Sequence, residues 1–129
     1  MKGGKVLGPI EIKDTKKYGR GVFATRLIKK GELIESAPAI IIPEKEWVNM
    51  KNSILSNYVF RWKRDKAIVL GFGLFYNHSY SPNAYYITNF DNISIDFYAR
   101  RDINKGEEIR VNYNGDPRDM SSLWFSVVE

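Results

Sequence analysis

Alternation of hydrophobic and polar side chains predicts β-strands along most of the chain. Residues 93–99 ("ISIDFYA") alternate apolar and polar side chains, which is typical of a strand with one buried face. Residues 31–43 ("GELIESAPAIIIP") are rich in isoleucine, and residues 67–73 ("AIVLGFG") form a short apolar run that ends in glycines. Glycine, asparagine and proline separate such runs at short intervals. We therefore expect a mostly β domain built from short strands.

A helical pattern is confined to one segment. Residues 44–55 ("EKEWVNMKNSIL") follow Pro43 and begin with glutamates, as the first turn of a helix often does. The last segment, residues 114–129, begins as a turn and then presents Trp124 and Phe125. Aromatic side chains so close to the C-terminus predict that this tail folds back onto the domain.

The size and composition predict one globular domain over residues 1–129. The chain is 43% hydrophobic and 14% aromatic, and at this length a domain buries roughly 65–70% of its unfolded surface. The absence of cysteine excludes disulfides and thiolate zinc sites and fits a reducing compartment. No apolar run is long enough for a signal peptide or a membrane span. We expect a soluble, cytoplasmic protein.

The net charge adds a second possibility for binding partners. Twenty Lys and Arg side chains against fifteen Asp and Glu give a formal charge of +5. Small basic clusters occur at residues 16–17, 29–30 and 61–66, but most of the charge is scattered. The charge could attract nucleic acid or acidic partners, or it could be ordinary solvated surface.

Several common chemistries lack the residues that they need. His78 is the only histidine and there is no cysteine, so we predict no metal site. Ser79 adjoins His78, but sequence neighbours do not form the relay of a nucleophilic triad. The glycines of residues 18–21 ("YGRG") and 71–73 ("GFG") lack the lysine and spacing of a phosphate-binding loop.

Three motifs, taken together, resemble a known family. They are "GRG" at residues 19–21, "NHSYSPN" at 77–83 and "GEEIRVNY" at 106–113. In this order and spacing they resemble the SET-domain protein lysine methyltransferases, over roughly residues 6–116. The likeness is to minimal viral and bacterial members, which lack flanking zinc modules.

The resemblance implies a fold and a set of site residues. It implies the SET-domain (β-clip) fold, in which several small sheets and short helices surround a pseudoknot-like crossing of the second and third motifs. It implies S-adenosylmethionine as the methyl donor, and a catalytic pair of Tyr113 with Tyr58, which lines the lysine channel. The resemblance assigns donor binding to Gly19, Arg20, Gly21, Asn77, His78, Tyr113 and Trp124.

Some of these assignments carry alternatives. The backbone of Gly19, Arg20, Gly21 and His78 would make most of their donor contacts, and His78 would also fix the crossing. Either Trp124 or Phe125 could cover the adenine, with the tail 114–129 folding over the cofactor site. Each residue has a plainer interpretation as a turn or core residue.

The function implied is transfer of a methyl group to the ε-amine of a lysine in a protein, with a histone or histone-like protein among the possible substrates. A non-catalytic interaction module with the same fold, or a basic nucleic-acid-associated protein, are the alternatives. The oligomeric state, including a homodimer, stays open, and a viral or effector protein would work in a host nucleus. Val111 stands where a larger aromatic residue often limits methylation, so we expect more than one methyl to be added.

Overall fold

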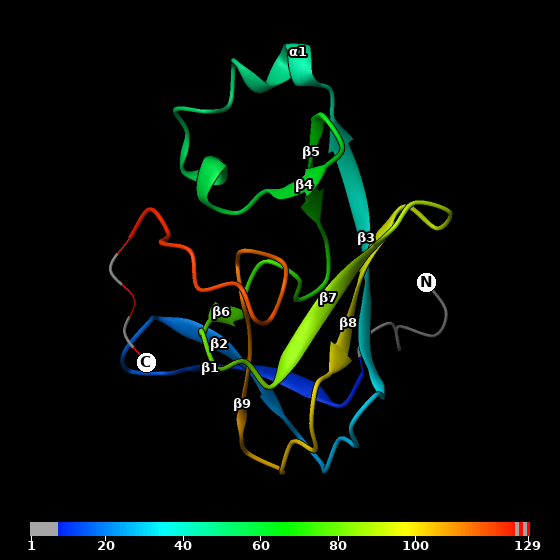
Figure 1. Cartoon of the computed structure of the whole chain (residues 1–129), viewed down its shortest axis with the longest axis vertical. Coiled ribbons are helices and arrows are strands. Elements are labelled where there is room, and N and C mark those ends of the chain that lie inside the picture. The colour runs from blue at the N-terminus through cyan, green and yellow to red at the C-terminus, as the bar shows by residue number, and fades with distance from the viewer. Residues whose placement is uncertain (1–7, 126, 128) are drawn as a thin grey trace.

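The strands form two small sheets in the computed structural model, which describes residues 8–125, 127 and 129 (Figure 1). The four-stranded sheet has the order β1-β2-β9-β6, formed by Ile10–Asp14, Arg20–Ala24, Glu108–Val111 and Asn77–His78. The five-stranded sheet has the order β4-β5-β3-β8-β7, formed by Phe60–Trp62, Asp65–Val69, Leu33–Ile42, Ser94–Ala99 and Ala84–Asn89. The prediction of a mostly β fold of small sheets is confirmed.

The long strand β3 organises the larger sheet. Its first half pairs with β8 and its second half with β5, both antiparallel. Its core face carries Glu35 and Ala37, and the neighbouring β8 adds Ile95 and Phe97, all of them buried. The ring of Tyr76 stacks on Phe97 at 4.2 Å between centroids. The isoleucine-rich pattern of residues 31–43 therefore predicted the central strand correctly.

The helix expected over residues 44–55 is much shorter than predicted. The segment contains only α1 (Glu44–Trp47) and, after turns, the 3₁₀ helix η1 (Ile54–Asn57). Pro43 at the N-cap makes no side-chain capping bond, and no residue of α1 is buried. Without a cap or a packed face, so short a helix gains too little to propagate. Nowhere in the described residues does a helix reach the length and apolarity that a membrane crossing requires.

The half-buried strand expected over residues 93–99 is also corrected. The strand begins at Ser94, because Ile93 has a φ of 52° and ends the preceding turn. Its polar positions are buried as well as its apolar ones. The Asp96 carboxylate accepts hydrogen bonds from the hydroxyls of Ser36 and Ser94 and from the amide of Asn89. A polar cluster with Ser36 and Asn89 thus shields Ser94 and Asp96 from solvent, which the alternation alone could not predict.

This cluster makes Asp96 important for stability, and we expect Asp96→Ala to lower the free energy of unfolding by about 1–3 kcal/mol, because the buried Ser94 hydroxyl and the less buried Ser36 and Asn89 side chains lose their acceptor. Burial raises the pKa of Asp96, but the hydrogen bonds from Ser36, Asn89 and Ser94 outweigh it, so the pKa lies below its usual value. The stabilisation is present above the unfolded-state pKa and is lost as the pH falls through the lower folded-state value. Urea denaturation at several pH values should show the wild-type acid-induced loss, weakened in the variant. Equal midpoints for the two proteins at neutral pH would contradict this role.

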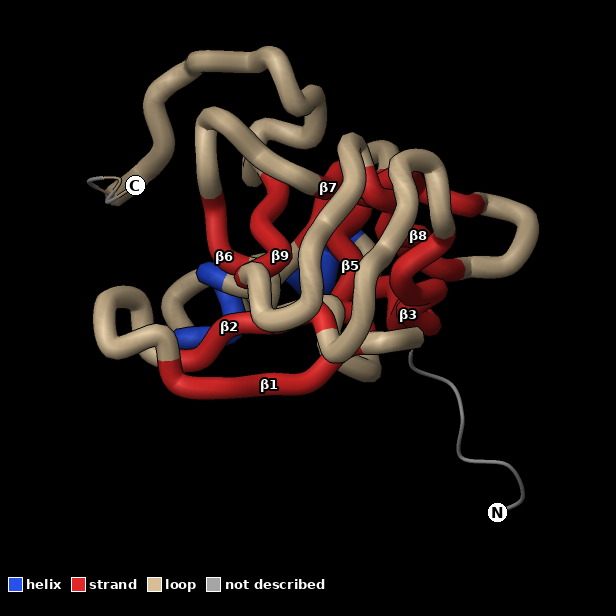
Figure 2. The backbone as a smooth tube through the Cα atoms, turned by 90° about the horizontal axis from the view of Figure 1, so that it is seen from below, coloured by secondary structure: helices blue, strands red, loops and turns tan. Residues whose placement is uncertain are grey.

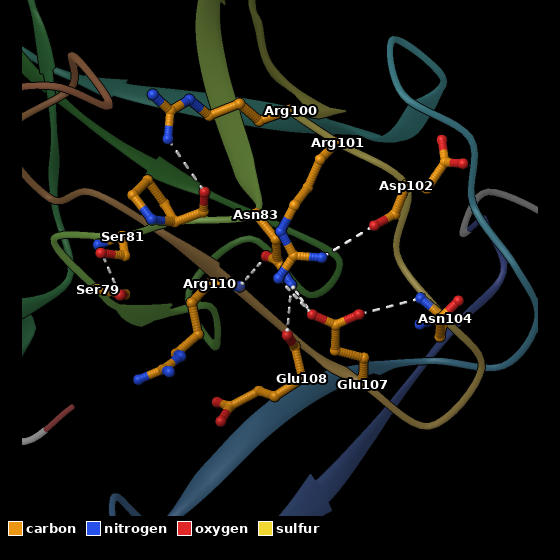
Figure 3. Close-up of polar contacts among 11 residues, drawn as sticks. Ser79, Ser81, Asn83, Arg100, Arg101, Asp102, Asn104, Glu107, Glu108 and Arg110 are labelled. Atoms are coloured by element: carbon orange, nitrogen blue, oxygen red, sulfur yellow. Dashed lines mark hydrogen bonds and ion pairs between the residues drawn. The ribbon is translucent and has the colours of Figure 1, made fainter.

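The second and third motifs meet where β6 pairs with β9. This pair is parallel, with Asn77 opposite Arg110 and His78 opposite Val111, and Figure 2 shows the two strands side by side. Asn83 fixes the end of the second motif against β9, as Figure 3 shows. Its amide donates to the carbonyl of residue 108 at 2.8 Å, and its side-chain oxygen accepts the N–H of Arg110 at 2.9 Å. Segments about thirty residues apart in the chain are therefore locked together beside the site.

Candidate active site

Two cavities adjoin the crossing of β6 and β9. The narrow cavity, of about 100 Å³, is mostly aromatic, and its walls include Tyr58, Phe60, Tyr76, Tyr86, Val111 and Tyr113. The wide cavity, of about 420 Å³, is more polar, and its walls include Tyr18, Gly19, Arg20, Phe75, Asn77 and Phe125. Residues that border both cavities include Tyr58, Leu74, Tyr113 and Trp124. The structure therefore brings the first, second and third motifs to one place.

Tyr113 is held rigidly at the wall that the two cavities share. It follows β9, and its backbone N–H donates to Nδ1 of His78 at 3.0 Å. Its hydroxyl donates to the backbone carbonyl of Tyr76 at 2.7 Å. Burial is the main cause that raises the pKa of Tyr113, so its phenol stays protonated at physiological pH. Because the proton is committed to Tyr76, the oxygen lone pairs of Tyr113 are available to a ligand.

His78 supports Tyr113 and also borders a hollow of about 290 Å³, which shares Tyr18, Asn77, Tyr113 and Phe125 with the wide cavity. Its ring is buried against Tyr80 and Tyr113, and burial is the main cause that lowers its pKa. A neutral ring that accepts at Nδ1 carries its proton on Nε2, which has no hydrogen-bond partner among the described residues. The described residues also contain no cluster of three or more His, Cys, Asp or Glu that could hold a metal. The position of His78 is consistent with a structural role, in which its ring supports the crossing of β6 and β9.

The two glycines of the first motif have different surroundings: Gly19 faces open space beside the wide cavity, and Gly21 is tightly enclosed. Gly19 has a φ of +82°, and a Cβ there would meet no atom within 4 Å, so the backbone is open to the cavity. Gly21 is enclosed, because a Cβ there would lie 2.9 Å from the Asn77 amide nitrogen. That amide donates to the carbonyl of Arg20 at 3.1 Å and to the carboxylate of Glu108 at 2.8 Å. Only glycine at position 21 lets Asn77 join the two motifs.

The C-terminal tail contributes two aromatic side chains. Trp124 lies nearly parallel to the ring of Tyr113, at 6.0 Å between centroids and 15° between planes, and it is 62% exposed. Phe125 lies 6.1 Å from Tyr113 and borders only the wide cavity of the two. The Glu129 carboxylate accepts from the hydroxyl of Ser79 at 2.7 Å and so ties the tail to the second motif. Both aromatic candidates therefore lie at the wide cavity, and the covering role of the tail stays a prediction.

Two features of the site were missed from the sequence. Tyr86 borders the narrow cavity, and burial, opposed by the charge of Arg61, raises its pKa to about 12. Glu35 is a buried acid that accepts from the hydroxyl of Tyr76 and from the N–H of Phe72, both at 2.8 Å. Burial is the main cause that raises the pKa of Glu35. The sequence could have indicated Glu35 only as a single acidic residue at a core-facing position of an isoleucine-rich strand.

The wide cavity has the features that S-adenosylmethionine requires. Aromatic rings of Tyr18, Phe75 and Phe125 offer apolar surface to an adenine, and the backbone at Gly19 leaves open space. Arg20 supplies a guanidinium, 4.6 Å from the ring of Phe75, as a partner for a carboxylate. The residues of the wide cavity therefore fit S-adenosylmethionine, with aromatic surface for its adenine and a guanidinium for its carboxylate.

The fold and site define a class of enzyme. The sequence pattern of the SET domain matches residues 19–114. The chain belongs to the SET-domain family of protein-lysine methyltransferases. The resemblance inferred from the three motifs is confirmed.

Named relatives are about one-third identical to the chain over the aligned residues. A histone-lysine N-methyltransferase of Schizosaccharomyces pombe, specific for H3 lysine-37, is 34% identical over an alignment of 122 residues, and the match covers 93% of this chain and 79% of that protein. An H3 lysine-36 specific enzyme of Saccharomyces cerevisiae is 32% identical over an alignment of 124 residues, and the match covers 87% of this chain but only 17% of that protein. A crystal structure of a candidate histone methyltransferase of Plasmodium falciparum superposes with a TM-score of 0.67 at 32% identity, covering 84% of this chain and 95% of that one. None of these three is viral or bacterial.

Proposed function

We propose that the protein transfers a methyl group from S-adenosylmethionine to the ε-amine of a lysine in a histone or histone-like protein. The main support is the position of Tyr113, which borders both a narrow aromatic cavity and a wide polar one. The named functions of the S. pombe and S. cerevisiae relatives support a histone substrate. In this proposal the wide cavity takes the donor and the narrow cavity takes the lysine side chain.

The narrow cavity suits an uncharged amine. A lysine ammonium has a pKa near 10.4, so its neutral form costs about 4.6 kcal/mol at pH 7. The aromatic walls formed by Tyr58, Phe60 and Tyr86 remove water from the ammonium, which lowers its pKa. The amine can then release its proton to solvent before the reaction, and no strong protein base is needed.

Tyr113 orients the amine at the boundary between the cavities. Because its hydroxyl proton is donated to the carbonyl of Tyr76, its oxygen accepts an N–H of the amine and aims the nitrogen lone pair. When bound, S-adenosylmethionine would supply a methyl group on a positively charged sulfur, and Tyr113 would hold the amine with its lone pair directed toward that group. Alignment of this kind contributes on the order of 7–11 kcal/mol to such reactions.

A transfer assay with labelled S-adenosylmethionine and core histones tests the proposal. We expect label on lysine, with the modified position identified by mass spectrometry, and no label with a protein whose lysines have been blocked. Donor binding by calorimetry without transfer to any histone or other basic protein would instead favour a non-catalytic module. A histone substrate would bring the enzyme to chromatin, whereas the cytoplasmic location stays a prediction from the sequence and the oligomeric state stays open.

Val111 should set the number of methyl groups added. Its buried side chain borders the narrow cavity and is small for that position, so the wild-type enzyme is expected to form dimethyl- or trimethyllysine. Val111→Phe fills part of a cavity of about 100 Å³ and should shift the product to monomethyllysine. Mass spectrometry under excess donor measures the distribution, with Val111→Ala as the control that keeps the room. A wild-type product that stops at one methyl would contradict the assignment.

A further inference from the structure

A third depression, which we call the basic groove, adjoins the narrow cavity. It has a volume of about 340 Å³, and its walls include Phe60, Arg61, Lys66, Tyr86 and Tyr113. Phe60, Tyr86 and Tyr113 also border the narrow cavity, so the groove and the narrow cavity share a wall. The basic groove is therefore next to the place where a substrate lysine would enter the narrow cavity.

The two cations of the basic groove face each other across the β4–β5 hairpin. Arg61 and Lys66 are directly opposite in the antiparallel register. Like charges in this arrangement destabilise a strand pair, so the pair does not serve the stability of the hairpin. The groove is the surface that both side chains border.

Within the described residues, no acid forms an ion pair with Arg61 or Lys66. The described ion pairs all lie elsewhere, and the groove has no Asp or Glu in its wall. Asp65, the acid of the hairpin, accepts the backbone N–H of Glu44 at 2.8 Å. Lys66 lies 5.7 Å from the ring of Trp47, a contact that holds it in place without neutralising it. The positive charge of Arg61 is felt at Tyr86, whose pKa it lowers against the effect of burial.

We infer that the basic groove binds an acidic residue, Asp or Glu, within a few residues of the methylated lysine. This inference rests on the proposed function, because that function defines which chain enters the groove. A substrate carboxylate in the groove would complement two cations that form no ion pair among the described residues. The shared wall favours a peptide over nucleic acid, because the occupant must be continuous with the lysine in the narrow cavity.

Binding of labelled peptides tests the groove without requiring transfer. The probes are short peptides with one lysine, carrying Glu, Gln or Lys at each neighbouring position in turn, measured by fluorescence anisotropy in the presence of S-adenosylhomocysteine. At one or two positions, Glu is expected to improve the Kd over Gln by about three- to tenfold, since the ion pairs are partly exposed. This preference should shrink as salt is raised.

The double variant Arg61→Gln, Lys66→Gln should abolish the preference for Glu. The matched control Lys29→Gln, Lys30→Gln makes the same change of charge on a surface outside the groove and should keep it. The groove variant should melt at the same or a higher temperature than the wild type, because a like-charge pair is removed.

The outcomes separate this inference from the proposed function. Equal affinity for Glu and Gln peptides at every position, or a preference that the groove variant retains, would overturn the inference. If the groove variant lost only affinity for duplex DNA and kept its preference for Glu peptides, the cations would be assigned to nucleic acid and the inference would also be overturned. Peptide preference without any methyl transfer would contradict the proposed function and leave the groove assignment standing. Methyl transfer without any preference for Glu would support the proposed function and overturn the groove assignment.

Discussion

Tyr113→Phe is expected to lower turnover by about 10²–10³-fold while donor affinity stays within about twofold of the wild type. The substitution removes one oxygen, and with it the acceptor that orients the amine and the hydrogen bond to the carbonyl of Tyr76. Losing one preorganised polar group at a reacting centre commonly costs this much. The aromatic ring remains, so the wall shared by the two cavities is kept.

Single-turnover transfer and calorimetry of donor binding measure the two effects separately. Tyr85→Phe is the matched control, because Tyr85 stacks on Tyr98 in the β7–β8 pair and borders neither cavity. It should retain wild-type turnover. Activity of Tyr113→Phe within threefold of the wild type would exclude the orienting role of the hydroxyl.

The pH dependence of transfer offers an independent check on Tyr113. Its raised pKa keeps the phenol neutral, and the pKa of Tyr86 is about 12, so neither group ionises in the usual assay range. The rate should therefore rise between about pH 7 and pH 10 as the substrate ammonium loses its proton, with no decline from a phenol. A falling limb below pH 10 that Tyr113→Phe removes would show that the phenol titrates earlier.

Glu35→Ala is expected to reduce both stability and turnover, although Glu35 borders neither cavity. The buried carboxylate accepts from the N–H of Phe72 and the hydroxyl of Tyr76, and the carbonyl of Tyr76 in turn receives the Tyr113 hydroxyl. Leaving both donors unpaired should cost about 2–4 kcal/mol in unfolding free energy. A shift of the Tyr76 carbonyl should lower turnover by about tenfold with little change in substrate KM.

The split between kcat and KM distinguishes positioning from general destabilisation. Assays well below the melting temperature of the variant keep it folded, and Glu35→Gln, which can still accept one bond, should recover part of the turnover. Glu32→Ala is the control, since that acid pairs with Arg26 at the surface and should change both quantities little. Full turnover in Glu35→Ala would remove the link between this acid and Tyr113.

The strand pattern predicted much of the fold because burial acts on local sequence. The apolar run of residues 31–43 became β3, and residues 67–73 overlap the end of β5. The helix of residues 44–55 was overestimated, because a pattern cannot tell whether a face will find a surface to pack on. The second face of β8 was misjudged because Asp96 is buried by partners from two other strands.

Site residues could be predicted from the sequence only where they matched a pattern of the family that the chain resembles. The residues of the three motifs, together with Tyr58 and Trp124, were named from that resemblance, and their spacing alone did not show that they would meet. Tyr86 and Glu35 belong to no motif, and their contacts join positions far apart in the chain. Such contacts have no local signature for a single sequence to display.

The sequence by itself determined the mostly β class, the family, and the absence of cysteine and of a second histidine, because these depend on residue identity and local order. Only the tertiary structure decided that Tyr113 stands between two cavities, that Glu35 holds Tyr76, and that Arg61 and Lys66 face one groove. The reason is physical: cavities, buried hydrogen bonds and uncompensated charge arise from atoms brought together by strand pairing. The parallel pairing of β6 with β9 brings the second and third motifs together beside Tyr113, whereas the pairing of β4 with β5 places Arg61 opposite Lys66.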